Sequence, residues 1–155
     1  MSYEVKLREV PTIKAMTKRF VTGMKTISPD MSKEYNELWS HIQKNGGVPT
    51  GDCFALYHDE NFDADKMDIE VGFSVAELVP NGEGIEGREV EGGLFASTIH
   101  KGSYYGLESA YATLGKWVAE NGYVPLTPAR DLYLNDPSTV QPEELLTEVL
   151  WPVRK

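Results

Sequence analysis

The sequence is poor in cysteine and has no long apolar run. Cys53 is the one cysteine among 155 residues, so no internal disulfide can form, and a reducing compartment fits this composition. No run of about 18 apolar residues occurs, which argues against a membrane-spanning helix and a membrane partner. The N-terminal stretch is charged and has no apolar core, so it does not resemble a signal peptide. We therefore expect a cytoplasmic protein.

Basic residues are also scarce, with 15 Lys and Arg against 24 Asp and Glu, which gives a net charge of −9. Nucleic-acid backbones are bound by clustered basic side chains. No basic cluster is longer than the pair Lys18-Arg19, so we expect no direct nucleic-acid contact. The acidic balance favours neutral or cationic partners.

Metal and nucleotide motifs are missing as well. The three histidines, at positions 41, 58 and 100, lack metal-ligand spacing with each other or with Cys53. The glycines from Pro80 to Gly93 form neither a dinucleotide fingerprint nor a phosphate-binding loop. We expect no metal and no cofactor.

The chain contains an internal repeat. The motif NGGVP at 45–49 recurs as NGYVP at 121–125, and the Leu-Tyr and Glu-Val pairs that follow recur in the same order. We predict one α+β domain over 1–155, with pseudo-repeats at about 1–79 and 88–155. Each repeat would be a strand–helix–strand–strand unit. The antiparallel sheet would carry two helices on one face and a ligand groove on the other.

Helix signals fall at matching places in the two repeats. Ser28-Pro29-Asp30 combines a capping residue, a first-turn proline and a first-turn acid, so it predicts a helix start. Gly102-Ser103 predicts the second start. The five glycines and several acids of Pro80–Gly93 indicate a linker between the repeats.

The stretch from Pro128 to Val153 carries the leading candidate site. It predicts two strands, and alternation places Asp131 and Tyr133 on one face of the first. We assign Glu148 of the second strand to the same side, as the wall of a ligand groove. A desolvated carboxylate pair beside aromatic rings would attract a cation and would raise one carboxyl pKa, which suits general-base work. The alternative is the solvated face of a half-exposed sheet.

Three motifs resemble the GyrI-like small-molecule-binding family, which includes effector-binding domains of AraC-type and MerR-type regulators and a stand-alone DNA gyrase inhibitory protein. They are His100-x-Gly102-x-Tyr104, the segment 131–137 (DLYLNDP) and the closing Thr147-Glu148-Val149 with Pro152-Val153. The resemblance implies an aromatic-lined cleft with a carboxylate, often binding lipophilic cations. The family often has glutamate where this chain has Asp131, which is one methylene shorter.

Further candidates follow from the repeat and the resemblance. Tyr57 and Glu70 are the first-half counterparts of Tyr133 and Glu148, whereas Ala55 replaces Asp131, so the halves are chemically unequal. Tyr104 is assigned to the groove, and His100 to a hydrogen-bonding role in the turn before the second helix. The predicted ligand-binding residues are Asp131, Tyr133, Glu148, Tyr104, Tyr57 and Glu70.

The function these features favour is binding of lipophilic, neutral or cationic small molecules. One alternative is a hydrolase of strained electrophilic toxins, with Asp131, Glu148 and Tyr104 as catalytic candidates; some stand-alone members of the family have such activity. The other alternative is an inhibitor of DNA gyrase, or a partner of another DNA enzyme or a separate regulator, acting by protein–protein contact.

Overall fold

The computed structural model describes residues 3–59, 63–103, 106–135 and 139–155. The chain separates into two compact units. The first unit is Pro11–Gly92, and the second is Gly93–Lys155 together with Met1–Val10. Neither helix of the described residues is long and apolar enough to cross a membrane.

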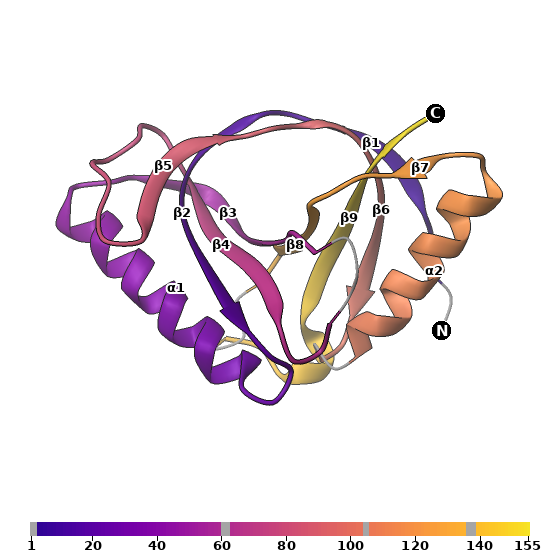
Figure 1. The fold of residues 1–155 in the computed structure, drawn as a ribbon, viewed down its shortest axis with the longest axis horizontal. Coiled ribbons are helices and arrows are strands. Elements are labelled where there is room, and N and C mark those ends of the chain that lie inside the picture. Colours follow the sequence, from indigo (N-terminus) through magenta and orange to yellow (C-terminus); the bar gives the residue numbers. More distant parts are fainter. Residues whose placement is uncertain (1–2, 60–62, 104–105, 136–138) are drawn as a thin grey trace. The chain divides into compact units, whose positions relative to one another are not determined.

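The first unit is a four-stranded antiparallel sheet with one helix, α1, beside β2 and β4 (Figure 1). Its strands lie in the order β3-β4-β2-β5. The elements are β2 (Ile13–Thr22), α1 (Ile27–Lys44), β3 (Pro49–Tyr57), β4 (Met67–Val75) and β5 (Ile85–Val90).

The second unit repeats this arrangement, with α2 beside β6 and β9 (Figure 1). Its strands lie in the order β1-β6-β9-β8, all antiparallel, and the short β7 pairs with the end of β9. The predicted strand–helix–strand–strand repeat and the α+β class are therefore confirmed. The elements are β1 (Lys6–Val10), β6 (Gly93–Lys101), α2 (Leu107–Glu120), β7 (Val124–Pro125), β8 (Ala129–Tyr133), the 3-10 helix η2 (Pro142–Glu144) and β9 (Leu146–Arg154).

Two predicted boundaries were wrong. The first helix starts after Thr26 and not at Ser28, because the Thr26 and Thr22 hydroxyls both donate to the Asp30 carboxylate, at 3.0 and 2.6 Å, and fix the first turn. The predicted linker contains β5, which pairs along β2. The glycines and acids of this stretch obscured the strand pattern in the sequence, yet the residues at the two ends of β5, Ile85 and Val90, are buried.

Aromatic rings lie between each helix and its sheet. In the first unit Trp39 and Tyr35 of α1 both pack on Phe73 of β4, with ring centroids 5.2 and 5.6 Å from it. In the second unit Trp151 of β9 lies against Gly115 of α2 and also meets the ring of Tyr111 from the same helix. The core of the second unit is Ala96, Ala110, Leu114, Val118, Val149 and Val153.

Candidate functional site

The strand register places Asp131 and Glu148 on opposite faces of the second unit's sheet. Asp131 lies directly across from Val149, and Leu132 lies across from Glu148. Residues directly opposite each other in an antiparallel pair share a face. Val149 belongs to the core under α2, so Asp131 faces the helix and Glu148 faces away from it. Our assignment of Asp131, Tyr133 and Glu148 to one wall was therefore wrong, because alternation within each strand does not fix the pairing between strands.

Asp131 is a buried carboxylate with a phenol as its hydrogen-bond donor. Its exposed fraction is 1%. Tyr111, which projects from α2, donates its hydroxyl to Asp131 Oδ1. Burial, together with the negative charge of Asp131, raises the Tyr111 pKa well above its usual value, so this phenol stays protonated at neutral pH. Because a phenol is neutral, this hydrogen bond adds no positive charge to the Asp131 side chain.

Aromatic rings surround this pair. Tyr111 meets Trp151 edge to face, with centroids 6.3 Å apart. Tyr133 shares the helix-facing side with Asp131, and its charge when ionised would also raise the Tyr111 pKa. The sequence analysis missed Tyr111, although it lies in the apolar stripe of the helix and has Tyr35 as its counterpart in the first repeat. We call Asp131, Tyr111 and Tyr133 the Asp131 cluster.

Polar groups continue along this face toward the start of α2. His100 on β6 uses both ring nitrogens: Nδ1 is 2.9 Å from Tyr3 Oη, and Nε2 is 2.9 Å from the Ser103 carbonyl oxygen. The predicted hydrogen-bonding role of His100 in the turn is confirmed. Thr147 lies opposite both His100 and Tyr133 and is fully buried. Tyr104, the remaining candidate here, lies outside the described residues.

Glu148 is held on the helix-free face by an ion pair. Arg8 Nη1 donates to Glu148 Oε2 at 2.5 Å, and the Ser97 hydroxyl donates to the same oxygen at 2.6 Å. Glu148 is nearly buried, whereas the Arg8 side chain is 40% exposed. The guanidinium places a positive charge directly against this carboxylate.

Glu70 in the first unit has the equivalent environment. Arg88 Nε and Nη2 donate to its two carboxylate oxygens at 2.9 and 2.7 Å, and His58 Nε2 lies 2.8 Å from Oε1. Burial raises the pKa of Glu70, but hydrogen bonds from His58, Arg88 and Thr17 outweigh that effect and hold the pKa far below its usual range.

The two ion pairs correspond strand by strand. Glu148 on β9 and Glu70 on β4 are each bound by a hydroxyl from the next strand, Ser97 on β6 or Thr17 on β2. Each is also bound by an arginine from the outer strand beyond, β1 or β5. The sequence analysis found both glutamates but neither arginine, because it treated β5 as linker and did not relate β1 to β5.

The helix-facing side of the first unit has no counterpart of Asp131. Ala55 lies across from the buried Val71, as Asp131 lies across from Val149. Tyr35, the counterpart of Tyr111, donates instead to the Phe54 carbonyl oxygen at 2.5 Å. Tyr57 lies across from Ile69 on the same side. The predicted inequality of the halves at this position holds in the structure.

Comparison with known protein families identifies the family of this chain. The model of the GyrI-like small molecule binding domain matches residues 3–154. The chain belongs to this family. The resemblance noted from the sequence is confirmed over nearly the whole GyrI-like domain. A comparison with curated protein sequences gave no match.

Solved structures resemble this GyrI-like domain closely. The crystal structure of the EcmrR C-terminal domain is 29% identical, with a TM-score of 0.87 over 100% of this chain and 99% of that one. EcmrR in a cryo-EM complex with DNA is also 29% identical, with a TM-score of 0.90 over 99% of this chain, which spans 58% of that longer chain. SAV2435 bound to tetraphenylphosphonium is 14% identical, with a TM-score of 0.68 over 97% of this chain and 94% of that one, and this likeness shows the fold.

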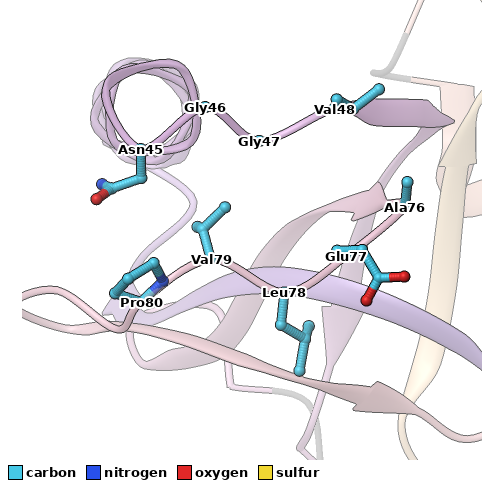
Figure 2. A pocket seen from close by; sticks show the side chains of 9 residues that line it. All are labelled: Asn45, Gly46, Gly47, Val48, Ala76, Glu77, Leu78, Val79 and Pro80. Atoms are coloured by element: carbon cyan, nitrogen blue, oxygen red, sulfur yellow. The ribbon is translucent and has the colours of Figure 1, made fainter.

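A surface pocket of about 340 Å³ lies elsewhere in the GyrI-like domain, at the end of α1 (Figure 2). Two chain segments line it, residues 45–48 and residues 76–80, and Figure 2 shows mainly backbone and aliphatic side chains around it. None of the predicted site residues lines this pocket. We identify the Asp131 cluster by its buried carboxylate and its aromatic neighbours.

Proposed function

We propose that this GyrI-like domain binds amphipathic cations at the Asp131 cluster of the second unit. The observation that carries the proposal is a carboxylate with 1% exposure that is bound by a neutral phenol. A charge in an apolar layer is costly to desolvate unless a partner compensates it. A cationic ligand that entered here would be attracted by the Asp131 carboxylate.

The surrounding rings support the same ligand class. Trp151 and Tyr133 lie on the helix-facing side with Tyr111. Aromatic faces attract cations by about 0.5–2 kcal/mol, depending on how far the contact is desolvated. The ligand would therefore carry apolar bulk around its charge. In this proposal Tyr111 leaves Asp131 when the cation arrives, and α2 shifts enough to admit it.

Glu148 and Glu70 have a different role in this proposal. Each is already paired with an arginine, so a cation gains little from either carboxylate. We infer that they hold neighbouring strands in register. Charge recognition then depends on Asp131, and the first unit, with Ala55 at that position, does not share it.

A calorimetric titration with tetraphenylphosphonium tests the proposal, and the probe is motivated by its presence in the SAV2435 structure. Asp131→Asn keeps the side-chain shape and removes the charge. We expect binding by the wild-type protein and at least about tenfold weaker binding by this variant, which corresponds to about 1.4 kcal/mol. Asp68→Asn is the matched control, because Asp68 pairs with Arg19 at the surface of the first unit.

The control should bind like the wild-type protein, and circular dichroism should show all three proteins folded. Absence of heat and of any thermal shift with the wild-type protein would overturn the proposal. Equal affinity of the wild-type and Asp131→Asn proteins would overturn the assignment of the site.

A further inference from the structure

Thr147 is a buried hydroxyl within the polar end of the second unit's helix-facing side. It lies on β9, the strand between β6 and β8, with His100 across from it on one side and Tyr133 on the other. Its exposed fraction is 0%. Among the residues that the structure describes, none hydrogen-bonds to Thr147 Oγ1. Buried polar groups are normally satisfied, so an exception of this kind needs a physical explanation.

The obvious neighbour cannot satisfy this hydroxyl. Both nitrogens of His100 are already engaged, one by Tyr3 and the other by the Ser103 carbonyl. Thr98 lies two residues before His100 on β6 and on the same face. Its hydroxyl is satisfied, because it donates to the Glu4 carbonyl oxygen at 2.8 Å. Thr98 and Thr147 thus lie on one face, and Thr147 is directly across from Tyr133 of the Asp131 cluster.

The position of Thr147 relates it to that cluster. Asp131 is across from Val149, so Thr147 is its diagonal neighbour on the same face. Such diagonal pairs lie about 7 Å apart. A hydroxyl has one proton to donate, and among the described residues the proton of Thr147 has no acceptor. A ligand whose cationic centre meets Asp131 would bring other atoms close to Thr147 Oγ1.

We propose that Thr147 is a specificity-determining residue of this site, and that the preferred ligand is an amphipathic cation with a hydrogen-bond acceptor a few bonds from its charged centre. This inference rests on the proposed function. The Thr147 hydroxyl donates to that acceptor, for example an ether or carbonyl oxygen. A purely hydrocarbon-substituted cation binds but leaves the hydroxyl unsatisfied.

A matched pair of probes tests the inference. Butyltriphenylphosphonium and (2-methoxyethyl)triphenylphosphonium differ by one ether oxygen in place of a methylene. In calorimetric titrations we expect the wild-type protein to bind the ether probe about five- to tenfold more tightly, the size of one buried hydrogen bond. Thr147→Val should bring the two affinities within about twofold, whereas Thr147→Ser, which keeps the hydroxyl, should retain the preference.

Thermal unfolding separates this role from a structural one. Valine replaces an unsatisfied hydroxyl with a methyl group of the same shape, so Thr147→Val should unfold at the same or a higher temperature than the wild-type protein. Thr98→Val is the control: it loses a satisfied hydrogen bond, so it should unfold at a lower temperature and keep the probe preference.

Four results would overturn the inference. Equal binding of both probes by the wild-type protein would do so and leave the proposed function intact. A Thr147→Val protein that keeps the preference, or that loses affinity for both probes along with thermal stability, would make Thr147 structural. Failure of both probes to bind the wild-type protein would overturn the proposed function and this inference together.

Discussion

Asp131 and Glu148 lie on paired neighbouring strands, yet their side chains leave the sheet in opposite directions. One meets a phenol from α2 and the other an arginine from β1. Because a guanidinium cancels a carboxylate charge and a phenol does not, the two acids differ in what they offer a ligand. The proposed cation site is therefore on the helix side of the second unit.

Replacing Tyr111 with phenylalanine should destabilise the protein and change its behaviour in alkali. Loss of a buried hydrogen bond to a carboxylate should cost about 1.5–3 kcal/mol at neutral pH. The raised pKa of Tyr111 means that the stability from its neutral form is complete below pH 10, the usual tyrosine value, and is lost as pH rises toward the higher folded pKa. Urea unfolding between pH 8 and pH 11 should therefore show that the free energy of unfolding falls less steeply with pH in Tyr111→Phe than in the wild-type protein.

Tyr123→Phe serves as the control for that experiment, since Tyr123 stacks on Trp117 away from the Asp131 cluster. If the free energy of unfolding fell equally steeply with rising pH in Tyr111→Phe and in the wild-type protein, the expectation would be contradicted.

Removing one partner of the Glu70–Arg88 ion pair should destabilise the protein more than removing both partners. Arg88→Met leaves a buried carboxylate with His58 and Thr17 alone, which should destabilise the protein by about 3–5 kcal/mol. Adding Glu70→Leu removes the stranded charge and should recover most of that loss. Guanidinium unfolding of the single and double variants measures both effects. Additive losses in the double variant would show that the pair does not behave as a unit.

The acid side of the stability profile should depend on Glu70. Its folded pKa lies far below its ordinary value of 4.5, so the stabilisation is complete above about pH 4.5 and is lost as pH falls below that value. Glu70→Gln should lower stability at pH 7 and should weaken the dependence on pH between about pH 4.5 and pH 2. Chemical unfolding at several acid pH values would decide this, and parallel profiles would count against it.

Substituting alanine for Gly115 should stabilise α2. A Cβ atom there would lie 3.4 Å from the ring of Trp151, which is ordinary van der Waals contact. Alanine is favoured over glycine inside a helix by about 1 kcal/mol, so we expect a gain of about 0.5–1 kcal/mol. Gly115→Leu, which pushes further into the ring, should instead destabilise the protein. Thermal unfolding of both variants provides the comparison, and a loss with alanine would contradict the geometry.

The sequence predicted the repeat, the two helices and the family, because these depend on local patterns. The strand from Met67 to Val75 has apolar residues at alternate positions, although Glu70 and Ser74 between them are buried as well. The sequence did not predict which face of the sheet Glu148 occupies, since that depends on the pairing between β8 and β9. It also missed the donor of Asp131, because Tyr111 was interpreted only as part of an apolar helix stripe.

The arginines were missed for a different reason. Arg8 comes from a strand at the start of the chain, and its acid partner Glu148 lies near the other end. No spacing within either repeat connects them. β5, which carries Arg88, follows its repeat unit and pairs with β2, whereas β1 precedes the whole first unit and pairs with β6.

This exchange of outer strands sets an order of events during synthesis on the ribosome. The first unit is one continuous segment, Pro11–Gly92, and all its strands are available once that segment has emerged. Lys6–Val10 leaves the ribosome before it but finds its partner only when Gly93–Lys101 has been made. The nascent chain therefore carries this strand without its partner while the first unit is made, and the strand can enter its sheet only once β6 has emerged.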